Sequence, residues 1–391
     1  MRDLICISHL RWDFVWQRPQ HLLSRLARNT RVLFVEEPVT VEGEGQPLLE
    51  IFPGQKTSNV TVARLVQPVP AHRWIGHGDP LTSQLYCERL LDYLDRQGIK
   101  RPLLWLYTPM ASDFVDALPH KLLVYDVMDQ LAAFKGAPAE LREREHLLLS
   151  RADVVFTGGV SLYRDKLAHN PNTHLLPSGV EIDHFARAAR RANFTCPPEF
   201  AALTGPILGY FGVIDERMDL PLLAHLAAAH PEWNVALVGP VVKIDPADLP
   251  QAPNLHYIGM RSYDQLPAYL AYFDVALVPF AMNESTRFLS PTKTLEYMAA
   301  HKPIVSTPIH DVIELYGDVV SIGYTPEEFV AHAEQVLLGD SYNRARADEL
   351  LNQHTWDGIA RHIQRLIDRK LVIETVQHAE QLKSKTTAQI S

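Results

Sequence analysis

Residues 274–298 read DVALVPFAMNESTRFLSPTKTLEYM, and this stretch decides the fold class. It opens with a continuous apolar run, which is typical of a strand buried on both faces of a parallel sheet. A polar loop follows, and then Ser290 and Pro291 provide a favourable N-cap and first helical residue. A strand, a loop and a helix in this order predict one unit of a parallel α/β sheet.

The start of this predicted helix has the properties of an anion site. The backbone amides of Thr292 and Lys293 would be free at the carboxyl end of the strand, where the helix dipole favours negative charge. Lys293 adds a full positive charge, and Glu296 follows about one turn later, where it could accept hydrogen bonds from ribose hydroxyls. A capped surface helix without any ligand would explain the local pattern equally well.

The same alternation of apolar runs and helical segments extends over the rest of the 391 residues and occurs twice. It predicts two Rossmann-like parallel α/β domains, with the carboxyl ends of both sheets at a central cleft. The predicted divisions are a first domain at 1–185, a linker at 186–205, a second domain at 206–355, and a C-terminal helix with a polar tail at 356–391. This helix has an apolar face at Ile359, Ile363 and Ile367, so we expect it to return to the first domain.

Composition and charge exclude several classes of protein. The formal net charge of −9 argues against nucleic acid as a partner, because phosphate backbones require a basic surface. The three cysteines, Cys6, Cys87 and Cys196, are far apart and form no CxxC pair, so we expect no disulfide framework. The sequence predicts neither a signal peptide nor a transmembrane helix, so we expect a cytoplasmic location with at most peripheral membrane association.

Three stretches of the second half resemble the donor-binding domain of glycosyltransferase family 4. They are 274–308, GYFGVIDERMDLPLL at 209–223, and NLHYIG at 254–259. The resemblance extends over about 205–338, and SHLRWDFVWQRPQHL at 8–22 fits a bacterial cell-surface polysaccharide subgroup. It implies a GT-B fold and a retaining glycosyltransferase. The implied donor is a nucleotide diphosphate sugar, a UDP- or GDP-sugar, and the implied acceptor is a glycan, a lipid-linked sugar or a small molecule.

The resemblance also assigns donor-site residues. The implied set is Gly212, Arg217, Ser290, Thr292, Lys293, Thr294 and Glu296. Within it, Arg217 and Lys293 would also act in catalysis by stabilising the diphosphate. Family members commonly have two glutamates separated by seven residues. Glu296 fits the second position, whereas Phe288 occupies the first, and Glu284 in the preceding loop could substitute for it.

The sequence provides no recognisable metal site. No Asp-x-Asp motif occurs, and Asp, Glu and His are not clustered at metal-ligand spacing. We therefore expect no metal and no other cofactor. The charge of the leaving diphosphate would instead be stabilised by fixed cations and backbone amides, which is electrostatic catalysis.

The first domain is expected to bind the acceptor. Its candidate acceptor residues, in and beside the loop that follows the first strand, are His9, Arg11, Trp12, Trp16 and Arg18. The tryptophans could stack on a sugar ring or a lipid, and the arginines could hold an anionic acceptor or a donor phosphate. Part of this aromatic set could instead pack beneath the loop, and His9 could be structural.

Two carboxylates, Asp126 and Asp129, follow the apolar run at 122–125. The resemblance makes Asp126 the first candidate for a catalytic residue in the first domain, where it would position sugar hydroxyls or receive the acceptor proton. Asp129 is expected to cap the next helix, which is a common role for Asp after a strand.

Two other functions fit the same pattern. A nucleotide-sugar epimerase can use the same fold and diphosphate site, but it releases a changed nucleotide sugar and needs no acceptor. A non-catalytic protein that binds a glycan or a nucleotide sugar is favoured by Phe288 at the first glutamate position. Product analysis separates the epimerase, and binding without turnover identifies the binding protein.

Overall fold

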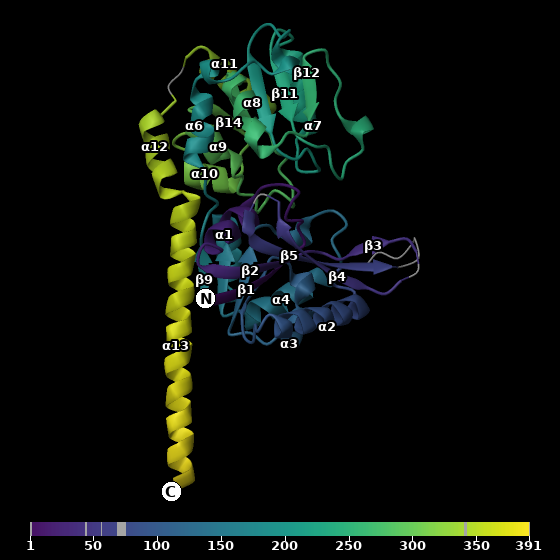
Figure 1. Ribbon diagram of the computed structural model, residues 1–391. Coiled ribbons are helices and arrows are strands. Elements are labelled where there is room, and N and C mark those ends of the chain that lie inside the picture. The colour runs from purple at the N-terminus through teal and green to yellow at the C-terminus, as the bar shows by residue number, and fades with distance from the viewer. Residues whose placement is uncertain (1, 44, 56, 69–75, 340–341, 391) are drawn as a thin grey trace.

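The computed structural model describes residues 2–43, 45–55, 57–68, 76–339 and 342–390, with side chains up to Ile373. Two separate sheets form two α/β domains, one above the other in Figure 1. A long C-terminal helix, α13 (Trp356–Ile390), runs beside the first domain and projects beyond it (Figure 1). The predicted α/β class with two parallel sheets is confirmed.

The first domain is built on a nine-stranded sheet in the order β3-β5-β2-β1-β6-β7-β8-β9, with β4 paired to β5. Its strands are β1 (Arg2–Ile7), β2 (Thr30–Val35), β3 (Val39–Val41), β4 (Leu48–Gly54), β5 (Thr57–Pro68), β6 (Leu103–Leu106), β7 (Leu122–Val127), β8 (Val154–Thr157) and β9 (Thr173–Leu175). The pairs are parallel except β4 with β5. The order from β5 to β8 is that of a Rossmann sheet.

Helices cover both faces of this sheet. They are α1 (Arg18–Leu26), α2 (Pro80–Arg96), α3 (Asp113–Ala117), α4 (Leu141–Arg151) and α5 (Val160–Leu167), with short 3-10 helices at Pro109–Ala111 and Leu131–Ala133. Apolar residues of α2, α3 and α4 pack on one face, and those of α1 and α13 pack on the other. The sheet therefore has a core on each side, which explains the continuous apolar runs of its central strands.

The second domain has a six-stranded parallel sheet in the order β12-β11-β10-β13-β14-β15. Its strands are β10 (Ile207–Phe211), β11 (Asn234–Val238), β12 (Leu255–Gly259), β13 (Val275–Val278), β14 (Ile304–Ser306) and β15 (Ser321–Ile322). Its helices are α7 (Leu220–Ala229), α8 (Leu266–Tyr272), α9 (Lys293–Ala299), α10 (His310–Tyr316), α11 (Pro326–Leu337) and α12 (Arg344–Gln353). The strand order reverses between β10 and β13, and ligands bind at the carboxyl ends of the strands at such a point.

The predicted linker is part of the second domain. It follows α6 (Ile182–Ala186) and contains three short 3-10 helices, Arg187–Ala189, Arg191–Asn193 and Pro198–Phe200. Phe185, Ala188 and Phe200 are buried in the core of the second domain. The predicted boundaries at 185 and 205 are therefore wrong, because irregular turns conceal apolar residues that pack without a helical or strand period.

The chain crosses between the domains twice at one place. The Val180 amide donates to the His354 carbonyl at 2.8 Å, and Val180 forms an isolated parallel bridge with Thr355. The first crossing leads into α6, and the second leads from α12 into α13. Both connections between the domains therefore meet at Val180.

The C-terminal helix returns to the first domain, as its apolar face predicts. Trp356, Ile359, Ile363 and Ile367 are buried in the same core cluster as α1. The backbone continues as one helix to Ile390, so the expected polar tail extends this helix. None of the described helices combines the length and the apolar character that a membrane crossing requires.

Candidate active site

Two connected cavities lie where the domains meet, at the carboxyl ends of both sheets. The first, here called the cationic cavity, has a volume of about 220 Å³ and contains Arg18, Arg217 and Lys293 in its walls. The second, here called the apolar cavity, has a volume of about 250 Å³. Residues that line both are Val15, Trp16, Gly212, Val213, Tyr263 and Leu266. One ligand can therefore extend through both cavities.

Lys293 begins α9 and reaches into the cationic cavity. Its ammonium lies 5.2 Å from the centre of the Tyr210 ring and 5.0 Å from that of Phe280. Burial and the neighbouring Arg217 lower the pKa of Lys293. Its ammonium donates no hydrogen bond to any described residue, so all three N–H groups are available to a ligand.

Gly212, at the end of β10, makes room for this lysine. A Cβ at this position would lie 2.8 Å from the Tyr210 hydroxyl oxygen and 3.1 Å from Cε of Lys293. Its φ of 139° also belongs to a region that favours glycine. Gly212 therefore lets the lysine stem pass directly over the strand end.

Arg217 enters the same cavity from the loop after β10. Its Nε and Nη2 donate to the buried carboxylate of Asp215 at 3.0 and 2.7 Å. Its guanidinium carbon also lies 5.4 Å from the ring centre of Phe134, which belongs to the first domain. Asp215 was not predicted as a site residue, yet it orients the planar guanidinium and leaves Nη1 without a described hydrogen-bond partner.

The start of α9 differs in detail from the prediction. The N-cap is Thr292, without a side-chain capping bond, so Ser290 is not the cap. The amides of Thr292 and Lys293 have no hydrogen-bond partner among the described residues. Ser290 and Thr292 line the cationic cavity, whereas Thr294 is fully buried and does not. Thr294 is therefore corrected to a structural residue.

Glu296 lines the cationic cavity one turn after Lys293. Burial raises the pKa of its carboxyl, and the neighbouring Lys293 opposes this effect. Its carboxylate accepts no hydrogen bond from the described residues. Gly212, Arg217, Ser290, Thr292, Lys293 and Glu296 thus lie around one cavity. Their roles toward a ligand stay predictions.

The carboxylate expected to contact the sugar lies outside both cavities. Asp126 is fully buried in β7 and pairs with Nε of Arg18 at 3.0 Å. Burial raises the pKa of Asp126, and Arg18 opposes the rise. Arg18 also donates from Nη1 to the Leu176 carbonyl at 2.8 Å. Asp126 is therefore corrected to a positioning residue, which holds Arg18 in the wall of the cationic cavity.

Asp129, two residues beyond β7, takes the place that was expected for Asp126. It lines the cationic cavity, and no described residue donates a hydrogen bond to its carboxylate. The following 3-10 helix has Gln130 as its N-cap, so the predicted capping role of Asp129 is wrong. Burial raises the pKa of Asp129, while Arg217 opposes the rise.

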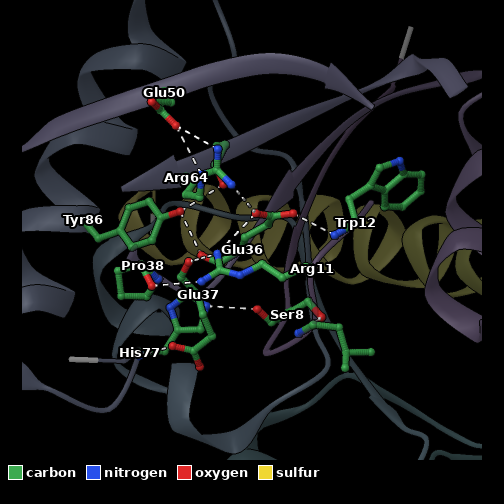
Figure 2. A network of polar contacts seen from close by, with 12 residues as sticks. Ser8, Arg11, Trp12, Glu36, Glu37, Pro38, Glu50, Arg64, His77 and Tyr86 are labelled. Atoms are coloured by element: carbon green, nitrogen blue, oxygen red, sulfur yellow. Dashed lines mark hydrogen bonds and ion pairs between the residues drawn. The ribbon is translucent and has the colours of Figure 1, made fainter. Parts of the chain in front are cut away.

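Arg11 and Trp12 bond to other residues of the first domain instead of facing a ligand. Figure 2 shows the Arg11 guanidinium beside Glu36, with which it pairs at 3.2 Å, and it also donates to the carbonyls of Glu37 and Pro38. The Trp12 amide donates to Glu36 at 2.7 Å (Figure 2). The Trp12 ring is 1% exposed and packs in the core, so its predicted role as an acceptor platform is wrong.

The network in Figure 2 continues to a histidine that was not predicted. The His77 amide donates to the Glu37 carboxylate at 3.0 Å, and its Nε2 faces the Ser8 carbonyl at 3.1 Å. His9, the predicted acceptor residue, lines neither of the two cavities. Burial lowers the pKa of His9 to about 4, and nearby His77 adds to this effect. His9 is therefore a neutral side chain near physiological pH.

Trp16 lies at the junction of the two domains, not in a site formed by the first domain alone. It lines both cavities together with second-domain residues, and its Nε1 faces Nδ1 of His21 at 3.2 Å. Phe14, from the same loop, lines the apolar cavity. Sequence reasoning assigned this loop to the acceptor because it belongs to the first domain. Its closeness to the second domain follows from the interdomain packing, which no local pattern reveals.

Phe288, at the position where relatives commonly have the first glutamate, does not line the cationic cavity. It packs against the core of the first domain and lines a separate groove between α4, α5 and the loop at 281–289. Glu284 lines that groove as well. Neither residue lines the two cavities described above, so Glu284 does not substitute for the missing glutamate in this arrangement. No group of three or more potential metal ligands occurs in the described part of the chain.

Comparisons with known proteins agree with this geometry. Residues 205–338, which contain Arg217, Lys293 and Glu296, match the family model described as "Glycosyl transferases group 1". A curated relative from Bacillus subtilis (strain 168), "Putative teichuronic acid biosynthesis glycosyltransferase TuaH", is 24% identical over 264 residues. That match covers 62% of this chain and 65% of the length of the relative.

Solved structures share the whole architecture. A sucrose-phosphate synthase from Thermosynechococcus elongatus superposes with a TM-score of 0.70 at 14% identity, over 95% of this chain and all of that one (100%). A structure titled "Trehalose-6-phosphate from E. coli bound with UDP-2-fluoro glucose" gives a TM-score of 0.65 at 14% identity, over 94% and 99% of the two chains. The chain therefore has the GT-B fold of these structures, and its residues 205–338 are similar to the glycosyl transferases group 1.

Proposed function

We propose that the protein is a retaining glycosyltransferase that uses a nucleotide diphosphate sugar and requires no metal. The observation that carries the proposal is the cationic cavity, where Lys293 from the start of α9 and Arg217 from the loop after β10 converge beside the free amides of Thr292 and Lys293. Two cations and unpaired N–H donors in one cavity are what a diphosphate requires. The family match over residues 205–338 supports the same conclusion.

The arrangement suits the departure of a nucleoside diphosphate. During transfer, the anomeric carbon exchanges its bond to a phosphate oxygen for a bond to an acceptor oxygen, and the acceptor proton leaves with the phosphate. Negative charge grows on the diphosphate as this bond breaks. Asp215 holds Arg217 in place before the reaction, and the Lys293 ammonium rests on the rings of Tyr210 and Phe280, so both cations are positioned to stabilise that charge.

Two further residues complete the proposed donor site. The Glu296 carboxylate accepts no hydrogen bond from the described residues, so it would accept hydrogen bonds from ribose hydroxyls. Asp129 lies in the same cavity and replaces Asp126 as the first-domain carboxylate that can reach the transferred sugar or the acceptor. The relative named for teichuronic acid biosynthesis supports a role in cell-surface polysaccharide synthesis. The cytoplasmic location stays a prediction from the sequence.

The test combines donor binding with product analysis. We expect calorimetry to detect tight binding of UDP or GDP, and we expect slow release of that nucleotide from the matching nucleotide sugar with water as acceptor. NMR of the freed sugar should show the anomeric configuration of the donor, and EDTA should leave the rate unchanged. Binding of neither nucleotide would overturn the proposal. A changed nucleotide sugar without release would identify an epimerase, and binding without turnover would identify a binding protein.

A further inference from the structure

A helix of the first domain is capped by a side chain of the second domain. Helix α5 begins after Gly159, which has no side chain to cap it. The carboxylate of Asp311, from α10 of the second domain, accepts hydrogen bonds from the Val160 amide at 2.8 Å and the Ser161 amide at 3.0 Å, and also from the Ser161 hydroxyl. The two orphan amides at the start of α5 are therefore satisfied from across the domain junction.

The partners of Asp311 all lie in the other domain. Its side chain is fully buried, and no described residue of the second domain donates a hydrogen bond to it. The dipole of α5 also favours a negative charge at this end of the helix. One turn further on, Arg164 of α5 and Glu314 of α10 form two hydrogen bonds of 2.7 Å each. The contacts of Asp311 thus serve the junction and not the fold of its own domain.

Gly159 allows the second domain to come this close. A Cβ at this position would overlap the Asp311 carboxylate and would lie 2.7 Å from Cβ of Ser290, another second-domain residue. The backbone of Gly159 is extended, with φ −157° and ψ 166°, a conformation that other residues also adopt. The close approach of the second domain therefore requires the glycine, whereas the local backbone does not.

The capped end of α5 borders the cationic cavity. Gly158, directly before Gly159, lines this cavity from the first domain. Ser290, which would contact a side chain at position 159, lines it from the second domain. The place where α10 meets α5 is therefore also the place where the two walls of the cavity meet.

The other end of α5 contacts the segment that carries Asp129. Lys166 of α5 is 2% exposed, and its ammonium donates to the Gln130 side chain at 2.6 Å and to the Glu145 carboxylate at 2.9 Å. Gln130 directly follows Asp129, which lines the cationic cavity. One helix thus connects Asp311 of the second domain with the first-domain carboxylate of the site.

We propose that Asp311 is a positioning residue of the active site, which sets the spacing of the two cavity walls by capping α5 across the junction. The inference rests on the proposed function, because Asp129 in one wall and Lys293 in the other are expected to act on the same donor and acceptor. Loss of the cap would leave these two groups without a fixed separation, and small misplacements of reacting groups reduce rates strongly.

Three variants test this role. Asp311→Ala removes the cap, and Gly159→Ala keeps it but pushes the second domain away with one methyl group. The matched control is Asp79→Ala, which removes a cap within the first domain, where Asp79 accepts from the Thr82 amide at 2.9 Å and lines neither cavity. We expect release of nucleotide from the nucleotide sugar to fall about 10- to 100-fold in the first two variants and to stay at the wild-type rate in the control.

Nucleotide affinity separates positioning from a general loss of folding. Lys293 and Arg217 both belong to the second domain, so calorimetry with UDP or GDP should give nearly wild-type affinity in all three variants. Turnover then falls without a matching loss of binding. A residue that only stabilised the fold would lower both quantities together through the unfolded fraction.

Distance labels measure the spacing directly. Leu147 of the first domain and Tyr324 of the second are exposed and can be replaced by cysteines that carry spin labels, with the partly exposed Cys196 changed to serine. We expect the interdomain distance to lengthen or its distribution to broaden in Asp311→Ala and Gly159→Ala, but not in Asp79→Ala.

Unchanged distance and turnover in Asp311→Ala and Gly159→Ala would overturn the proposal, as would an equal fall of turnover and nucleotide affinity. If Asp311→Ala does not fold, Gly159→Ala decides alone, because its backbone conformation suits alanine. Failure of wild type to bind any nucleoside diphosphate would instead reject the proposed function, and the label distances would still test the cap.

Discussion

The two sheets have the same central strand order and face each other across the domain junction, yet cations at their carboxyl ends differ in how many hydrogen bonds they donate to the protein. In the first domain, Arg11 and Arg18 donate to Glu36, Asp126 and main-chain carbonyls. In the second domain, Lys293 rests on two aromatic rings and donates to no described residue. Lys293 therefore offers all of its N–H groups to a ligand, whereas Arg11 and Arg18 give several of theirs to the protein, as Arg217 does to Asp215.

The first test of this comparison is to remove Asp126. Asp126→Ala leaves the buried charge of Arg18 without its partner, so the free energy of unfolding should fall by about 3–5 kcal/mol. Denaturation with urea measures this loss. The double variant Arg18→Met with Asp126→Leu removes both charges and should recover most of the stability. Normal stability of Asp126→Ala together with lost turnover would restore the predicted catalytic role of Asp126.

The second prediction contrasts two lysines of the second domain. Burial lowers the pKa of both, but the Lys302 ammonium donates to the carbonyls of Ala271 and Phe273 at 2.9 Å each, whereas Lys293 has no such acceptor. Lys293→Ala should reduce turnover roughly a hundredfold to a thousandfold, or about 2.7–4 kcal/mol, because charge on the diphosphate loses its stabilisation.

Lys302→Ala is the matched control for that loss. It should leave turnover near that of wild type and lower the free energy of unfolding by about 1–3 kcal/mol, because two carbonyls lose their donor. Steady-state kinetics and denaturation on both variants measure the contrast. Equal effects of the two substitutions on turnover would remove the distinction between structural and available cations.

A smaller effect is expected at Arg11. Arg11→Met removes the nearer of two cations that pair with the buried Glu36, the other being Arg64 at 3.8 Å, so the free energy of unfolding should fall by about 1–3 kcal/mol. Trp12 still donates its amide to Glu36, which limits the loss. Donor affinity should stay at the wild-type value, as calorimetry with UDP or GDP can check. A large loss of donor affinity in a stable variant would return Arg11 to the ligand site.

The weakest effect is the pH dependence of donor affinity. The lowered pKa of Lys293 means that its charge is lost as pH rises through that value, below the usual range of lysine. The raised pKa of Glu296 means that it gains a proton as pH falls through that value. Affinity for UDP or GDP should therefore be highest between the two, and should fall by up to about tenfold per pH unit beyond either limit.

Two variants test the high-pH and the low-pH limit of donor affinity separately. Lys293→Arg should remove the decline at high pH, because an arginine keeps its proton there. Glu296→Gln should remove the decline at low pH. Calorimetry across the pH range gives both profiles, and a flat wild-type profile would contradict the assignment.

Local pattern predicts local geometry well in this chain. Lys293, the free amides and Glu296 lie within one strand, loop and helix unit, so their mutual placement follows from 274–298 alone. The parallel sheets follow from apolar runs in the same way. The segment at 186–205 was misassigned because Phe200 packs from an irregular turn, where no period marks a buried residue.

Whether a side chain near the end of a strand faces the core or the cavity was harder to predict. Asp126 and Asp129 have the same side chain and are three residues apart, but the end of β7 at Val127 puts one inside the core and the other in the cavity. Trp12 and Trp16 both lie in the loop after β1, yet Trp12 is buried in the core and Trp16 lines both cavities. Which of two similar residues faces a ligand depends on where the strand stops and on the opposite domain, and neither is encoded in a motif.

The double crossing at Val180 has a mechanical consequence. Because both connections pass through one point, any change in the relative orientation of the two domains has to bend the backbone there. The loop that carries Phe14 and the loop that carries Met260 lie on opposite sides of the junction. One pair of distance labels on these loops would therefore report any change in the spacing of the two domains.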